Sequence, residues 1–361
     1  MIPHPSTFIA EEITTVLRQK AVEAEVLQQL HKDQLSIVLN QNWFNMYLPK
    51  TLGGLEMTIN EILKTEEALA WADGSVGWVV TLCSGAAWFV GFLDHDLSKE
   101  ILAEKNVCFA GSGATTGTAE KTETGYLING RWKYASGSNH ATVFTANCIL
   151  TKNGVPLKDD NGMTLTHSFL MKRNEVTLHK TWHAIGMTAT GSNSFEVKNL
   201  NISSNRCFTI DASLAKVVHP VFQYPFLQLA ETTLSINLSG MAARFLDLCA
   251  ALFEKRINHN PLSTKSLKKT EDNARQSHQE YRDQFYSAVE ESWNECVSGK
   301  LSSTTLHKVS ETSHALAQQS IRIVDELYPY CGLTAADPSE EINRVWRNLH
   351  TASQHSLFRR S

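Results

Sequence analysis

The stretch GYLINGRWKYASGS, residues 125–138, is a β-rich run that ends in small turn residues. A second run of the same kind, Ser194–Val197, lies further along the chain. Between Val107 and about Ile210 such short runs alternate with turn residues, as expected of strands joined by tight connections. This segment is roughly a hundred residues long, which is near the usual size of a domain. It predicts a central β domain.

Helical periodicity flanks this β segment on both sides. Upstream, apolar residues recur at three- and four-residue spacing from Phe8 to about Leu102, and downstream the same period returns from Val221 to the end of the chain. Strands and helices do not alternate, which excludes a parallel α/β sheet with crossover helices for most of the chain. We expect three units: a helical domain at 1–104, the β domain at 105–215 and a second helical domain at 216–361.

The composition restricts the class of protein. With 361 residues, of which 42% are hydrophobic and 19% charged, the chain can bury a large core. Its formal net charge of -4 offers no basic excess, so we expect no nucleic-acid partner. The segment Met1–Pro5 lacks the basic and apolar parts of a secretory signal. The most apolar stretch, Val76–Leu93, contains glycines and a serine and precedes two aspartates, so we expect buried helices and no membrane span.

The seven cysteines are scattered along the chain. Their number is odd and no two are spaced as C-x-x-C, which argues against a disulfide framework and against a zinc site. We therefore expect buried free cysteines, no bound metal and a reducing, cytoplasmic location.

The stretch Arg256–Lys269 has the composition of a surface loop. It carries three lysines and two asparagines beside Pro261. Because proline inside a helix removes a backbone hydrogen bond, we expect a solvated loop between two helices here.

Four parts of the chain together resemble the acyl-CoA dehydrogenase superfamily. They are Tyr47–Gly54 with Glu66–Trp78, Ala110–Lys121 with Gly125–His140, Trp182–Ser192, and Arg344–His350 with Gln354–His355. Within that superfamily they look like the branch of flavin-dependent hydroxylases and monooxygenases related to hydroxyphenylacetate and dibenzothiophene monooxygenases. The resemblance implies an α+β fold with an antiparallel β domain and a C-terminal four-helix bundle. It also implies a homotetramer and a bound flavin, either FAD or FMN.

The resemblance places the flavin against small and hydroxylated residues. Ala110–Gly117 reads as a loop of small residues, in which Gly111 and Ser112 would let backbone N–H groups approach the ring closely. In the matching family segment an aromatic side chain packs on the flavin and a hydroxyl bonds its N5. Here Tyr134 and Ser136 stand at those positions.

A second predicted loop, Trp182–Ser192, would line the other side of the ring. It supplies glycines for close approach and hydroxyl groups that include Thr190 and Ser192. We expect these two hydroxyls to belong to the cofactor site.

Departures from the family pattern bear on the chemistry. The position of the family's usual catalytic glutamate is Ser356, with His355 beside it. Imidazole titrates near neutrality, so His355 is our candidate catalytic residue. His350 lies about 140° away in helical projection, so the two histidines are not expected to share a metal. Asn348 replaces the family's aspartate, and the Arg-x-x-Phe-Gly element is absent, which suits an enzyme that takes reduced flavin from a separate reductase.

We expect a flavin-dependent hydroxylase or monooxygenase that acts with oxygen on a small organic substrate. Two alternatives stay open. One is an acyl-CoA dehydrogenase with a relocated base, for which Glu231 and Asp247 are candidates. The other is a flavin- or ligand-binding protein without catalysis.

Overall fold

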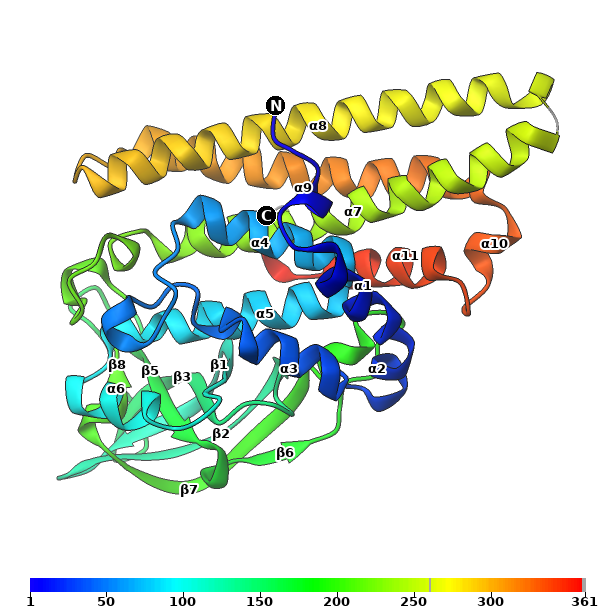
Figure 1. The fold of residues 1–361 in the computed structure, drawn as a ribbon. Helices are drawn as coiled ribbons and strands as arrows, with labels where there is room; N and C mark the ends of the chain where they lie inside the picture. Colours follow the sequence, from blue (N-terminus) through cyan, green and yellow to red (C-terminus); the bar gives the residue numbers. More distant parts are fainter. Residues whose placement is uncertain (260, 359–361) are drawn as a thin grey trace.

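The structure is a computed structural model that describes the backbone of residues 1–259 and 261–358 and the side chains of residues 1–256 and 266–358. The N-terminal helices are α1 (Glu11–Gln19), α2 (Ala21–Leu27), α3 (Lys32–Asn40), α4 (Ile59–Ala72), α5 (Gly74–Ala87) and α6 (His95–Leu102). The C-terminal helices are α7 (Phe226–His259), α8 (Pro261–Val297), α9 (Ser303–Cys331), α10 (Leu333–Ala336) and α11 (Glu341–Ala352). The sheet lies at one end of the molecule and α7, α8 and α9 lie at the other, with α4 and α5 between them (Figure 1).

The strands form one sheet, and in the sequence they lie between the two helical parts. They are β1 (Phe109–Lys121), β2 (Gly125–Ala135), β3 (Val143–Lys152), β4 (Val155–Pro156), β5 (Thr166–Lys172), β6 (Thr177–His179), β7 (Asn193–Ser203) and β8 (Cys207–Phe208). Their order is β6-β7-β2-β1-β3-β5-β8, with β4 paired to β3. The predicted succession of helices, sheet and helices is therefore present.

The expectation of an antiparallel sheet is wrong for one pair of strands. β1 and β3 run parallel, while every other pairing is antiparallel. The reason is topological. β1 and β2 form a hairpin, and the chain then crosses to the far side of β1 before β3 begins, so β3 takes the direction of β1.

The predicted small-residue loop at residues 110–117 is part of strand β1. Its pairing with β3 shifts register twice, between Ser112 and Thr115 and again between Thr115 and Gly117. Bulges of this kind leave backbone groups unpaired and bend the strand. The expectation of small residues with accessible backbone holds, but the element is a bulged strand.

Helix α5 is the central helix of the molecule, and nearly all of its residues are buried. It begins where α4 ends. The Asp73 carboxylate accepts a hydrogen bond from the Val76 N–H at 2.9 Å, which caps the new helix. The predicted buried helix pair at Val76–Leu93 is α5 with the 3₁₀ helix η4 (Trp88–Phe92).

Two segments are long and apolar enough to cross a membrane, Gly74–Phe92 and Phe226–Arg256. Within the molecule, 83% of the first and 67% of the second hydrophobic window is buried. Both segments are therefore accounted for as core helices of the fold.

The expected loop at Arg256–Lys269 is wrong. α7 continues to His259 and α8 begins at Pro261, with residue 260 outside the described residues. Proline is tolerated in the first turn of a helix, where its missing N–H has no partner to lose. Pro261 thus starts a helix, whereas we expected it to prevent one.

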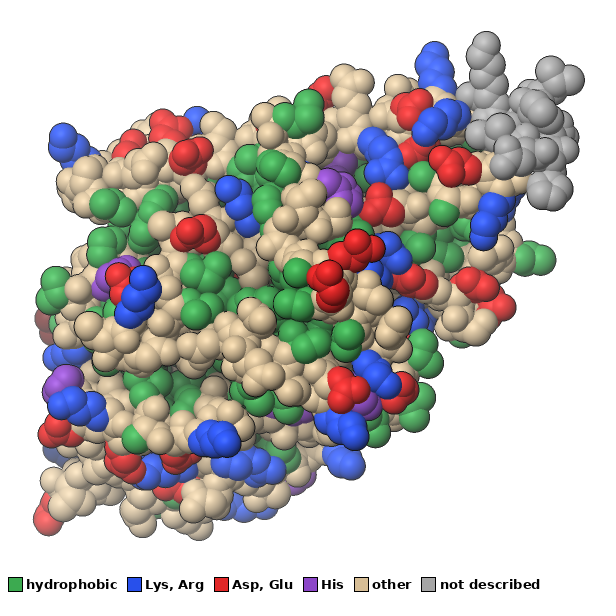
Figure 2. All heavy atoms as spheres, in the orientation of Figure 1, with side chains coloured by type: hydrophobic (Ala, Val, Ile, Leu, Met, Phe, Trp, Pro, Cys, Tyr) green, Lys and Arg blue, Asp and Glu red, His purple; other side chains and the backbone are tan. Residues whose placement is uncertain are grey.

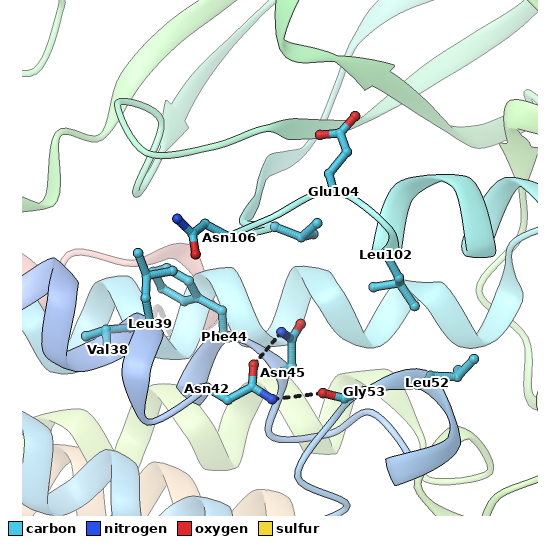
Figure 3. A pocket seen from close by; sticks show the side chains of 11 residues that line it. Val38, Leu39, Asn42, Phe44, Asn45, Leu52, Gly53, Leu102, Glu104 and Asn106 are labelled. Atoms are coloured by element: carbon cyan, nitrogen blue, oxygen red, sulfur yellow. Dashed lines mark hydrogen bonds between the residues drawn. The ribbon is translucent and has the colours of Figure 1, made fainter.

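The surface has a mixed charge pattern, and it has a cavity away from the predicted site residues. On the face drawn in Figure 2, basic and acidic side chains are interspersed, and no broad basic surface stands out. A cavity of about 210 Å³ opens between the Asn42–Gly53 region and Leu102–Val107 (Figure 3). The Asn42 amide there bonds the Gly53 carbonyl at 2.9 Å and Asn45 at 2.7 Å. None of the predicted site residues lines this cavity.

Candidate functional site

Three of the predicted residues form a buried chain of hydroxyl groups. Ser136 follows β2, Ser192 precedes β7, and Thr190 lies in the short helix η6 (Thr188–Thr190) between β6 and β7. The Oγ atoms of Ser136 and Ser192 are 2.8 Å apart, and Ser192 Oγ is 2.7 Å from Thr190 Oγ1. All three side chains are at most 6% exposed. Predicted cofactor residues from two separated segments thus contact each other directly, whereas we expected them on opposite sides of a flavin ring.

Both ends of this chain have fixed partners. The indole N–H of Trp78, on α5, donates to Ser136 Oγ at 3.2 Å. At the other end the Thr190 hydroxyl donates to the Met187 carbonyl at 2.7 Å. Trp78 lies on an apolar helix, where a large aromatic residue is commonly a core residue. It is buried, but its polar N–H places it in the site.

The loops that carry the hydroxyls are bonded to each other. The Gly137 N–H donates to the Thr190 carbonyl at 2.8 Å, and the Ser138 hydroxyl donates to the Gly191 carbonyl at 2.7 Å. Gly137 and Gly191 have φ values of +73° and +51°, in the left-handed region where glycine is favoured. Glycine therefore lets the two loops come together.

Helix α11 contacts the loop of residues 182–192, which carries Thr190 and Ser192, and holds it in place. The Asn348 side-chain oxygen accepts from the Met187 N–H at 2.6 Å, and the Arg347 guanidinium donates to the Ile185 carbonyl. Arg347 also pairs with Glu25 at 3.1 Å. A Cβ added to Gly186 would lie 2.1 Å from the Arg347 carbonyl oxygen, so only glycine fits there. Asn348, noted in the sequence only as a departure, positions this loop.

The predicted catalytic residue His355 lies beside Trp78. Their ring centroids are 6.0 Å apart in an edge-to-face arrangement. Burial lowers the pKa of His355, so the ring is neutral near pH 7. Its Nδ1 accepts a long hydrogen bond of 3.4 Å from the Leu357 N–H. His350 instead lies 3.2 Å from Asp325, and its ring packs at a tilt against Trp346, so its contacts differ from those of His355.

Tyr134 lies at the surface, two positions before Ser136 in the sequence. Its side chain is 67% exposed, and its ring meets Trp182 edge to face at 6.1 Å. Its φ of +65° is uncommon for a bulky residue and is a form of backbone strain that gathers at functional sites. Gly111 and Ser112 lie on β1 beside Thr145 and Ala146 of β3. In the described structure no hydrogen bond joins either residue to the hydroxyl chain.

The two candidates for a relocated base are engaged elsewhere. Glu231 accepts from Ser310 at 2.6 Å and lies 3.2 Å from His314. Asp247 accepts from the Trp71 indole at 2.7 Å and pairs with an arginine. Ser356, at the usual position of the family's base, has no acid–base side chain. Among the described residues, no group of three or more metal-ligating side chains is present.

The chain resembles known proteins along nearly its whole length. Residues 232–360 match the family model described as the C-terminal domain of acyl-CoA dehydrogenase. Indole-3-acetate monooxygenase of Acinetobacter baumannii is 26% identical over 358 residues, covering 95% of this chain and 88% of that protein. Through its C-terminal part the chain is thus similar to the acyl-CoA dehydrogenase superfamily.

Further similar proteins cover nearly the whole chain. The oxygenase subunit HsaA of a flavin-dependent monooxygenase from Mycobacterium tuberculosis is 25% identical over 94% of this chain and 88% of that protein. Its crystal structure matches with a TM-score of 0.89 and covers 99% of this chain and 93% of that one. XiaF from Streptomyces, solved with FADH2 and glycerol, matches with a TM-score of 0.85 at 17% identity over 98% of this chain and 91% of that one. This chain and the two solved structures thus share one overall fold.

Proposed function

We propose that this protein is the oxygenase component of a two-component flavin-dependent monooxygenase. It takes up reduced flavin from a separate reductase and uses it with oxygen to hydroxylate a small aromatic or apolar substrate. The observation that carries the proposal is the buried hydroxyl chain ending at Ser136, set between Trp78 and a strained, exposed Tyr134. The names of two relatives, a monooxygenase and the oxygenase subunit of another monooxygenase, support it.

The residues around Ser136 fit a flavin ring. Tyr134 and Trp182 offer aromatic surface, and the bulged part of β1 after Ser112 offers backbone groups without strand partners. A Cβ on Gly111 would lie 2.3 Å from the Thr145 hydroxyl, so β1 has room only for glycine at this position. We propose that these residues and the hydroxyls of Ser136, Ser192 and Thr190 hold the cofactor, FAD or FMN. Bound reduced flavin would supply the electrons that activate oxygen.

The side chains around the site keep water away and supply neutral hydrogen-bonding groups. Trp78 is 7% exposed and lies against both Ser136 and His355. Because His355 is neutral near pH 7, it can donate from one ring nitrogen without bringing a charge into the site. We propose that His355 donates to a developing negative charge on oxygen in a water-poor cavity.

The organisation of the whole protein follows the same proposal. We propose that the chain divides into domains 1–104, 105–215 and 216–361, and that the long C-terminal helices build a homotetramer in the cytoplasm. Sedimentation of the purified protein at micromolar concentration should give a mass four times that of the chain. A monomer would contradict the assembly.

The function is tested by mixing the purified protein with flavin and substrates. Under argon it should bind FMNH2 or FADH2, and on admission of oxygen it should hydroxylate a phenol or indole from a substrate panel. Bleaching of an oxidised bound flavin by an acyl-CoA would instead identify a dehydrogenase. Absence of flavin binding in either redox state would reject both activities.

His355→Ala should lower the hydroxylation rate by about a hundredfold, the usual effect of removing one such donor. Flavin affinity and the circular dichroism spectrum should not change. His350→Ala is the matched control on the same C-terminal segment and should retain most of the activity. A variant of His355 that loses stability but keeps its rate per folded molecule would make the residue structural.

A further inference from the structure

The two ends of the Ser136 chain determine the direction of its hydrogen bonds. The Trp78 indole nitrogen has one N–H and no lone pair to offer, so in its 3.2 Å bond with Ser136 it must donate. The Met187 oxygen is a carbonyl and can only accept, so in the 2.7 Å bond at the other end Thr190 must donate.

The direction of the two inner bonds then follows. Each hydroxyl has a single proton, and that of Thr190 is already given to Met187. Ser192 must therefore donate in the 2.7 Å bond to Thr190, and Ser136 must donate in the 2.8 Å bond to Ser192. Each of the three hydroxyl protons is therefore already donated in a hydrogen bond. Ser136 Oγ keeps one free lone pair and has no free proton.

The surroundings keep this direction in place. The Met187 carbonyl also accepts from the Trp182 indole at 2.8 Å and from the Thr190 N–H at 3.1 Å, so donors converge on it. Ser192 is 4% exposed and Thr190 is 1% exposed, which leaves no bulk water to take over a bond. A fully satisfied buried network of this kind is rigid.

We propose that this chain makes Ser136 select reduced flavin over oxidised flavin. The N5 atom of a reduced flavin carries a hydrogen and donates, whereas N5 of an oxidised flavin has only a lone pair and accepts. A Ser136 oxygen with a lone pair and no free proton is complementary to the reduced form. The inference rests on the proposed function, in which the ring lies against Ser136. Ser192 and Thr190 act as positioning residues.

The size of the preference follows from the bond that would be lost. To donate to oxidised flavin, Ser136 must withdraw its proton from Ser192, which forfeits about one net hydrogen bond. That corresponds to a preference of about fivefold to tenfold in affinity. Since flavin takes two electrons, a tenfold change in the ratio of affinities shifts the midpoint potential of the bound flavin by about 30 mV.

Thr190→Val tests the direction of the chain. The substitution keeps the shape of the side chain but removes the acceptor for the Ser192 proton. Ser192 can then donate to Ser136, which frees the Ser136 proton for oxidised flavin. The matched control is Thr188→Val, the same change in the same short helix at a hydroxyl that makes no hydrogen bond in the described structure.

The measurement is the dissociation constant of each variant for FMN and, under argon, for FMNH2. In Thr190→Val the dissociation constant for FMN divided by that for FMNH2 should fall fivefold to tenfold, mainly because oxidised FMN binds more tightly. In Thr188→Val this ratio should not change. A ratio in Thr190→Val within twofold of the unsubstituted protein, with the fold intact, would overturn the inference. If the unsubstituted protein binds neither form, the proposed function itself fails.

Discussion

Two neighbouring glutamates on α4, Glu66 and Glu67, are both fully buried and yet live in opposite surroundings. Glu67 accepts two hydrogen bonds from Arg282, at 2.7 and 2.8 Å, one from Tyr286 at 2.9 Å and one from Ser239 at 2.6 Å. In the described structure neither carboxyl oxygen of Glu66 has a hydrogen-bond partner. The charge of Glu67 is neutralised by the Arg282 guanidinium, whereas Glu66 has to be neutralised by a proton.

The pKa of Glu66 reflects this difference. Burial raises it well above its usual range, and the nearby Thr81 hydroxyl only partly opposes the rise. The Tyr47 hydroxyl also lacks a hydrogen-bond partner in the described structure, and burial raises the pKa of this phenol well above its usual value. Two adjacent glutamates can therefore behave differently because different side chains surround each of them.

Glu67→Gln should have the largest effect. It leaves the Arg282 guanidinium buried without a counter-charge, and breaking such a pair typically costs about 3–5 kcal/mol of the free energy of unfolding. Urea denaturation at pH 7 measures the loss. Glu326→Gln, which breaks an exposed pair with Arg322, should leave the free energy of unfolding nearly unchanged. Equal losses in the two variants would remove the distinction between paired burial and surface pairing.

Asp73 is a third buried carboxylate and gives a pH test. Burial raises its pKa from 3.8 to about 6, against the opposing pull of Arg344. The folded state therefore holds the proton more tightly than the unfolded state, and stability falls as pH rises from about 4 to about 6. The shift of roughly two units corresponds to about 3 kcal/mol.

Asp73→Asn removes this titration and keeps a good helix cap. The stability of the variant relative to the unsubstituted protein should rise by on the order of 3 kcal/mol between pH 4 and pH 7. Denaturation curves at several pH values measure the difference. A constant difference across that range would mean that Asp73 is ionised in the folded state at pH 4.

Glu66→Gln should act in the opposite sense to Glu67→Gln. Because folded Glu66 keeps its proton while unfolded glutamate loses it above the usual pKa, the unsubstituted protein loses stability as pH rises and the variant does not. The gain of the variant grows by up to about 1.4 kcal/mol per pH unit until the folded pKa is reached. If Glu66→Gln instead destabilises the protein at pH 7, Glu66 has a charged partner after all.

Sequence reasoning predicted the order of helices and sheet, and it named residues that come together in the structure. The periodicity of the flanking segments predicted the helices, and the resemblance singled out Ser136, Thr190 and Ser192, which meet in space. The parallel β1–β3 pair was missed because strand direction depends on how the chain crosses over, which local patterns do not record.

Trp78 was missed for a related reason. Its partner Ser136 is 58 positions away, and an aromatic residue on an apolar helix looks like core packing until that contact is known. Glu66 and Glu67 could not be told apart either, since they stand side by side in the same helix. Helical periodicity shows which face a residue occupies, but it does not show whether an arginine lies opposite.

The bond between the Met187 N–H and the Asn348 side-chain oxygen spans 161 positions of the chain. During synthesis the backbone at Met187, whose carbonyl ends the hydroxyl chain, thus stays without this bond until α11 has left the ribosome. The sheet and its strands can form earlier, but the loop that orients Ser192 cannot be fixed by them alone. Nascent chains arrested before residue 340 should therefore show a protected sheet and no selective uptake of reduced flavin, so that the enzyme stays inactive until translation is complete.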